Sequence, residues 1–140
     1  MITEEALKQY RQFEKDFAET SKHICELLIR YDKRYKGPWE EFEIFDEDCY
    51  KNKFVECTYY TSCMGERDAE TICFPMEFLF KTDVEINNWI DNKLEEERLE
   101  AERKKQEDEL KAKQNAERNA ERKRERDLAE YERIKKEYNL

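Results

Sequence analysis

Residues 82–140 contain neither glycine nor proline, and this limits the folds open to the whole chain. Thr82 and Glu85 have the spacing of a capping box, in which a hydroxyl and a carboxylate satisfy free N–H groups at a helix start. The dense Glu, Lys and Arg that follow favour a helix with ion pairs four residues apart on its surface. If all of residues 82–140 were helical, the rod would be roughly 90 Å long. We therefore predict a small head on a long helical stalk.

The apolar residues are unevenly distributed, and this divides the chain in two. Charged residues make up 45% of the sequence and hydrophobic ones 38%, which leaves enough apolar surface for only a small core. Most large apolar side chains precede residue 90, whereas residues 95–127 contain only Leu99 and Leu110. We predict a head over residues 1–81 and a stalk over residues 82–140, whose first turns pack on the head.

The first part of the head has the period of an amphipathic helix, from residue 3 to about residue 33. Its apolar positions recur every three or four residues: Leu7, Tyr10, Phe17, Ile24, Leu28 and Tyr31. Glu14 and Ser21 occupy two positions of the same stripe. We expect this stripe to pack on the core, and a partner-binding face is the alternative.

A change of period after Gly37 and Pro38 predicts three strands. They are expected over residues 41–44, 53–62 and 71–74, and polar segments at residues 46–52 and 63–69 connect them. Short connections favour antiparallel neighbours. The predicted fold is therefore α+β: an N-terminal helix packed on a three-stranded antiparallel meander, followed by a long, coiled-coil-like charged helix.

The residue inventory argues against an enzyme. The chain has one histidine and two glycines, and it lacks a Ser/His/Asp set or a glycine-rich phosphate loop. Its five cysteines show no Cys-x-x-Cys spacing, which favours reduced thiols over a zinc site or a disulfide framework. We expect no catalytic residue, no metal and no cofactor.

The charge and the N-terminal sequence indicate where the protein acts. A net charge of −9 does not attract nucleic acid or anionic lipid. The first residues lack the basic and apolar pattern of a signal peptide, and no apolar run is long enough to span a membrane. We expect a cytoplasmic protein that contacts neither a membrane nor nucleic acid directly.

One segment of the head is densely acidic, with six carboxylates within nine positions and no basic residue among them. They are Glu40, Glu41, Glu43, Asp46, Glu47 and Asp48. Three interpretations remain open: a solvated face that protects an edge strand, a phosphate-mimicking surface for a basic groove, and a divalent-cation loop. As the candidate partner-binding site, this segment would contact a protein with a basic surface.

A second candidate surface lies near the C-terminus, where four apolar side chains follow one another at helical spacing. They are Leu128, Tyr131, Ile134 and Tyr138. Because the heptad pattern is incomplete before Leu128, a coiled coil, a solitary helix and a frayed tail are all open. The apolar cluster favours association, so we predict that it forms an oligomerisation face of a homodimer.

The sequence of residues 39–105 resembles that of a group of known proteins. An acidic meander, the exit Phe-Pro-Met-Glu-Phe-Leu-Phe over residues 74–80 and a Glu/Arg/Lys-rich helix resemble small uncharacterised proteins encoded by bacteriophages and prophages. This resemblance implies a non-enzymatic inhibitor of a host defence protein, of the kind that includes anti-CRISPR proteins, acting in the host cytoplasm. The alternative is a structural adaptor that dimerises through the C-terminal helix.

Overall fold

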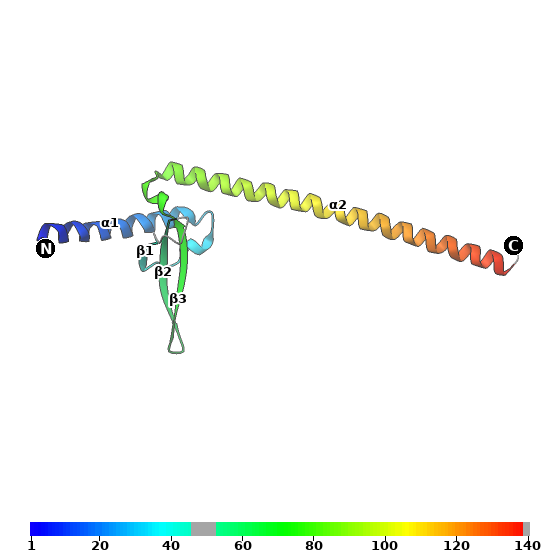
Figure 1. Cartoon of the computed structure of the whole chain (residues 1–140), viewed down its shortest axis with the longest axis horizontal. Helices are drawn as coiled ribbons and strands as arrows, with labels where there is room; N and C mark the ends of the chain where they lie inside the picture. The colour runs from blue at the N-terminus through cyan, green and yellow to red at the C-terminus, as the bar shows by residue number, and fades with distance from the viewer. Residues whose placement is uncertain (46–52, 139–140) are drawn as a thin grey trace. The chain divides into compact units, whose positions relative to one another are not determined.

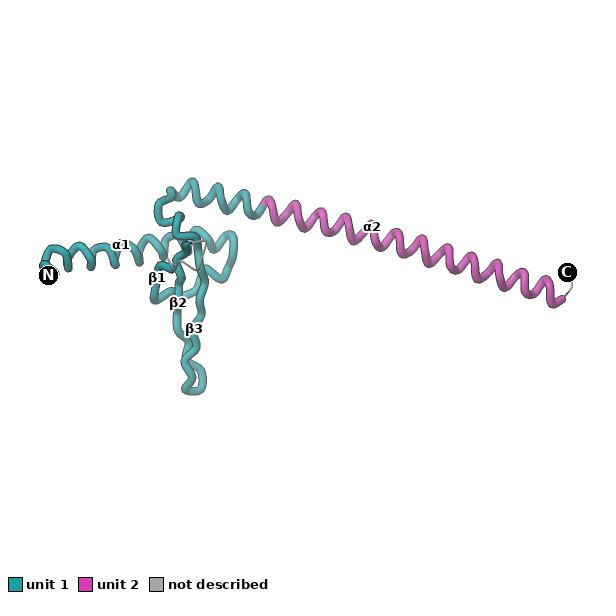
Figure 2. The backbone as a smooth tube through the Cα atoms, in the orientation of Figure 1, with its two compact units in different colours: residues 1–94 teal, residues 95–140 magenta. Residues whose placement is uncertain are grey.

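The computed structural model describes residues 1–45 and 53–138, and it has the predicted α+β fold (Figure 1). Its helices and strands are α1 (Glu4–Leu28), β1 (Glu41–Phe45), β2 (Phe54–Cys63), β3 (Glu66–Pro75) and α2 (Asp83–Glu137). Two short 3₁₀ helices cover Lys33–Lys36 and Met76–Phe80. Residues 1–94 form one compact unit and residues 95–140 a second, so the first turns of α2 belong to the first unit (Figure 2).

The three strands form the predicted antiparallel meander, in the order β1-β2-β3. Val55 on β2 lies opposite Ile44 on β1 and Phe74 on β3. Because side chains alternate along a strand, Val55, Cys57 and Phe74 lie on one face of the sheet. All three are buried, so this face carries the core.

The C-terminal half of α1 covers that face. Ile24, Cys25 and Leu28 are at most 2% exposed and pack with Val55 and Cys57. The N-terminal half of α1 differs from the prediction, because Leu7 and Tyr10 of the apolar stripe, and Phe13 beside it, are exposed. The stripe is therefore core over only half of its length.

Helix α1 ends at Leu28, earlier than the predicted residue 33. The carboxylate of Asp32 accepts a hydrogen bond from the backbone N–H of Arg34 and caps the 3₁₀ helix that follows. That short helix turns Tyr35 into the core, where its hydroxyl donates to the carbonyl oxygen of Cys73 at 2.6 Å.

Strand β3 begins five residues before the prediction, because the expected loop at residues 63–69 is a tight hairpin. Cys63 pairs directly with Glu66. Met64 and Gly65 form the turn with φ values of 53° and 82°, and two successive positive φ angles are the signature of a type I′ turn. Every side chain from Thr61 to Glu70 is exposed, so this part of the hairpin has no buried face to produce an alternating pattern.

Replacing Met64 with asparagine is expected to raise the free energy of unfolding by about 0.5–1 kcal/mol. The left-handed conformation disfavours most L-residues, whereas Asn-Gly is a preferred type I′ pair. Chemical denaturation measures the change. Gly65→Ala is the opposing control, because a side chain at φ 82° is strained, so it should destabilise the fold.

Helix α2 begins at the predicted cap. The Thr82 hydroxyl accepts from the backbone N–H of Glu85 at 3.3 Å and donates to the Glu85 carboxylate at 3.2 Å. Four residues on, the helix buries Ile86 and then Ile90 in the core of the first unit. Two side-chain contacts hold the same turns: His23 of α1 forms a hydrogen bond with Asp83 at 2.9 Å, and Arg30, which follows α1, forms an ion pair with Asp91 at 2.5 Å.

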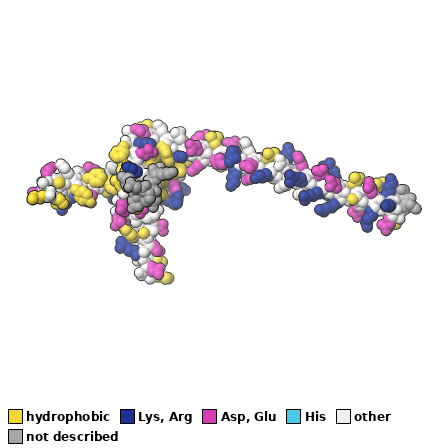
Figure 3. Space-filling view, viewed as in Figure 1, with side chains coloured by type: hydrophobic (Ala, Val, Ile, Leu, Met, Phe, Trp, Pro, Cys, Tyr) yellow, Lys and Arg dark blue, Asp and Glu magenta, His cyan; other side chains and the backbone are white. Residues whose placement is uncertain are grey.

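The second unit is a helix whose described side chains, through residue 138, are all exposed. Ion pairs three or four residues apart lie along its surface, including Arg98 with Glu95 and Glu102, Arg103 with Glu100 and Glu107, Lys111 with Glu107, and Arg133 with Glu130. Figure 3 shows both signs of charge interspersed along it. Among the described helices, none has the length and apolar character needed to cross a membrane.

Candidate functional site

Strand β1 places two of the predicted acidic residues on the solvent-facing side of the sheet. Glu41 and Glu43 alternate with Phe42, whose ring packs edge-on against Phe17 of α1, so the two carboxylates point away from the core. Glu40 precedes the strand and is exposed, and its backbone N–H donates to the carbonyl oxygen of Thr58. Asp46, Glu47 and Asp48 lie outside the described residues.

The sheet adds a carboxylate that the sequence analysis missed. Glu56 on β2 lies directly opposite Glu43 in the β1–β2 register. Glu41, Glu43 and Glu56 therefore share one face, which we call the acidic sheet face. Among the described residues, none forms an ion pair with these three side chains.

A tyrosine and an arginine border the acidic sheet face. The Tyr60 hydroxyl donates to the Glu41 carboxylate at 2.9 Å, and this hydrogen bond raises the pKa of Tyr60. The guanidinium carbon of Arg67 lies 4.1 Å from the centre of the Tyr60 ring, in a cation–π contact. Tyr60 therefore holds one carboxylate in place as a neutral donor.

Replacing Glu43 with glutamine is expected to raise the free energy of unfolding by about 0.2–1 kcal/mol, because like charges directly opposite each other destabilise a strand pair. Urea denaturation at low ionic strength measures the gain, which should shrink in high salt. Glu40→Gln is the matched control, since Glu40 lies outside β1 and has no facing carboxylate in the register. Equal gains in both variants would contradict the prediction.

Two of the described cysteines, Cys57 and Cys73, are poorly suited to nucleophilic chemistry. Cys25, Cys57, Cys63 and Cys73 are free thiols, and Cys49 lies outside the described residues. A hydrogen bond with Cys25, 3.6 Å between the sulfur atoms, and burial raise the pKa of Cys57. Partial burial and nearby Glu56 raise the pKa of Cys73. Both effects disfavour the reactive thiolate.

The outer part of the β2–β3 hairpin carries a second set of acidic residues, in a segment that was predicted to be largely a loop. Glu66, Asp68 and Glu70 alternate along β3, so they share the face opposite Arg67. All three are exposed. They lie on the other side of the hairpin from the acidic sheet face. Their substitution is therefore a matched control for substitutions in the acidic sheet face.

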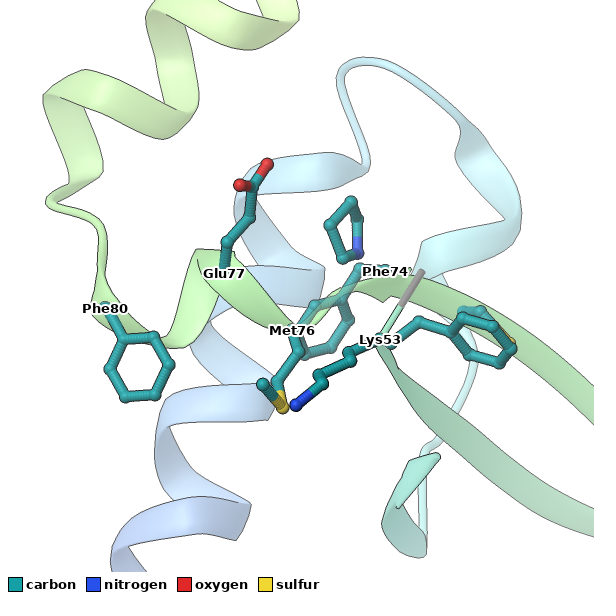
Figure 4. Close-up of a pocket in the computed structure, with 8 residues that line it drawn as sticks. Lys53, Phe74, Met76, Glu77 and Phe80 are labelled. Carbon is teal, nitrogen blue, oxygen red and sulfur yellow. The ribbon is translucent and has the colours of Figure 1, made fainter. Parts of the chain in front are cut away.

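A hollow of about 660 Å³ lies where β3 passes into the 3₁₀ helix (Figure 4). Phe74, Met76 and Phe80 form much of its apolar wall, and Lys53 and Glu77 are its charged residues. The wall differs in chemistry from the acidic sheet face. The hollow borders the acidic sheet face, because Cys73, which also lines it, lies opposite Glu56 in the β2–β3 register.

The predicted C-terminal oligomerisation residues lie together on α2. Leu128, Tyr131, Ile134 and Tyr138 recur at helical spacing and are all exposed, from 39% for Ile134 to 68% for Tyr138. We call them the C-terminal apolar face. Their role in oligomerisation stays a prediction.

No protein-family model matches this chain, and no curated protein or solved structure proved similar to it. The resemblance to phage-encoded proteins stays a prediction.

Proposed function

We propose that this protein is a non-catalytic inhibitor that binds a basic surface on a host defence or nucleic-acid-processing protein. The observation that carries the proposal is the pairing of Glu43 with Glu56 across the exposed face of the sheet. Facing carboxylates repel each other, and a lysine or arginine brought between them removes the repulsion and gains charge-assisted hydrogen bonds.

The spacing of the carboxylates also suits a partner protein whose basic groove normally binds nucleic acid. Glu41 and Glu43 are two residues apart on a strand, about 7 Å, and Glu56 is across from Glu43 at about 5 Å. Arginine and lysine side chains that contact phosphates can contact carboxylates with the same donors. A protein carrying such a surface competes with the nucleic acid for the basic groove.

The choice of a bacterial defence protein as the target comes from the sequence resemblance to phage-encoded proteins. An inhibitor of a defence nuclease needs no catalytic activity of its own, because it is enough to occupy the basic groove that binds nucleic acid. This is consistent with the raised pKa values of the Cys57 and Cys73 thiols.

Affinity capture from a bacterial lysate, followed by calorimetry with the purified target, tests the binding step. The variant Glu41→Gln/Glu43→Gln/Glu56→Gln should bind about tenfold more weakly, since three lost charge contacts at about 0.5 kcal/mol each correspond to that factor. The matched control is Glu66→Gln/Asp68→Asn/Glu70→Gln, which removes the same charge from the opposite face of the hairpin. Equal losses in both variants would remove the acidic sheet face from the mechanism.

The inhibition step has its own readout. The captured protein's nuclease activity should fall on addition of the wild-type chain, and the sheet-face variant should need about tenfold higher concentration for the same loss of activity. Expression in a bacterium with that defence should raise the plating efficiency of a sensitive phage. A target whose activity is unchanged by saturating wild-type protein would contradict inhibition while leaving binding intact.

The C-terminal apolar face favours a second candidate function, an assembly adaptor that dimerises through α2. A lone helix gains nothing from four exposed apolar side chains unless another surface covers them. Sedimentation of Leu128→Glu/Ile134→Glu beside the wild type tests this candidate. A monomeric wild-type chain would exclude it.

A further inference from the structure

The N-terminal half of α1 presents an apolar face that no described part of the chain covers. Leu7, Tyr10 and Phe13 are 43%, 58% and 56% exposed, and half-buried Phe17 continues the row. The rings of Phe13 and Phe17 stack with their centres 5.9 Å apart. Figure 3 shows hydrophobic side chains gathered along this end of the helix. We call these four residues the α1 apolar face.

The α1 apolar face continues the side of the helix that is packed in the core. Farther along the same stripe, Ser21, Ile24 and Leu28 are fully buried against the sheet. The helix therefore extends its packing surface past the edge of the core. Exposed aromatic residues of this kind are typical of a surface that another helix covers.

Two oppositely charged residues, Glu14 in the apolar row and Arg11 beside it, indicate which helix covers the face. Leu7, Tyr10, Glu14 and Phe17 occupy successive a and d positions of a heptad, so Glu14 stands in the middle of the apolar row. Its carboxylate accepts a hydrogen bond from Tyr10, which raises the pKa of that tyrosine. Arg11 borders the row, and it forms no ion pair with any described residue.

We propose that a second copy of this chain covers the α1 apolar face, with the two α1 helices antiparallel. An antiparallel pair centred between Gln12 and Phe13 brings Arg11 opposite Glu14 of the second copy, and symmetry repeats the contact. The same arrangement places Phe13 against its own counterpart at the two-fold axis. A parallel pair would instead put Glu14 beside Glu14, which like-charge repulsion disfavours.

The size of the face sets the expected strength of the dimer. The exposed apolar side chains offer on the order of 400 Å² per copy, given the area of each aromatic side chain. This is below the roughly 800 Å² per partner of a standard stable interface. Interfaces of this size belong to weak, transient complexes, so we expect a dissociation constant on the order of tens of micromolar.

Sedimentation equilibrium of the full chain up to about 200 µM tests the proposal, a range that brackets the expected dissociation constant. Arg11→Glu and Glu14→Arg should each weaken the dimer about tenfold, because each places two like-charge pairs at the interface. The double variant Arg11→Glu/Glu14→Arg should restore wild-type association to within about threefold. Far-ultraviolet circular dichroism confirms that each variant stays helical.

Matched charge reversals on α1 outside the apolar face provide the control. Lys15→Glu and Glu19→Arg change the same charges on the same helix and should leave the dimer unchanged. A wild-type chain that is monomeric at 200 µM would overturn the proposal, as would a dimer that survives Arg11→Glu but is lost in Leu128→Glu/Ile134→Glu. None of the α1 variants alters the acidic sheet face, so failure here leaves the proposed inhibitory function untouched.

Discussion

Replacing Phe78 with alanine is expected to lower the free energy of unfolding of the first unit by about 3–5 kcal/mol, as for other buried phenylalanines. Phe78 is 1% exposed. Its ring stacks on Phe74 of β3 and meets Trp89 of α2 edge-on, with ring centres 6.5 and 5.0 Å apart. Truncation removes the ring that joins the sheet to the first turns of α2.

A loss of this size is comparable to the whole stability of a unit of this length, about 5–14 kcal/mol. Urea denaturation followed by tryptophan fluorescence measures it, because Trp89 is a direct neighbour of the removed ring. Phe80→Ala is the matched control, since the same change at a residue that is 80% exposed should cost less than about 0.5 kcal/mol. Similar losses in both variants would show that Phe78 does not join the sheet to α2.

Local signals in the sequence were enough to predict much of this fold. The start of α2 followed from Thr82 and Glu85, whose hydrogen bonds form within one turn. The meander followed from changes of period and short connections. The hairpin at Met64 and Gly65 was missed because a methionine at positive φ is not a recognised turn residue and because exposed strands lack alternation.

The candidate site was less predictable, because it depends on strand register. Glu41 and Glu43 were identified from local charge, but Glu56 lies more than ten residues away and joins them only when β1 and β2 pair. Arg67 likewise contacts Tyr60 only when β2 and β3 pair. No short-range spacing reports such contacts.

The exposed half of α1 could not have been predicted from its own pattern, since buried and exposed halves carry one continuous stripe. The width of the sheet explains the outcome. Helix α1 has 25 residues and is about 38 Å long, and it runs across the strands rather than along them (Figure 1). Three strands about 4.8 Å apart span only about 10 Å from β1 to β3, so the sheet is too narrow to cover the whole helix. Sequence periodicity does not give the size of a sheet.

Replacing Ser21 with alanine is expected to raise the free energy of unfolding by about 1–3 kcal/mol, even though Ser21 lies within the packed stripe of α1. Ser21 is fully buried, and its hydroxyl forms no hydrogen bond with any described residue. A buried hydroxyl without a partner loses its hydration and gains nothing in return. Alanine removes that cost and is also the better helix former.

The exposed neighbour Thr20 separates these two contributions. Thr20→Ala changes helix propensity without removing a buried hydroxyl, so its gain should stay near 0.5 kcal/mol. Thermal and urea denaturation of both variants give the comparison. If Ser21→Ala raises the free energy of unfolding well above the rise for Thr20→Ala, the cost lies in the unpaired hydroxyl. Equal rises, or a fall for Ser21→Ala, would show that the hydroxyl contributes no such cost.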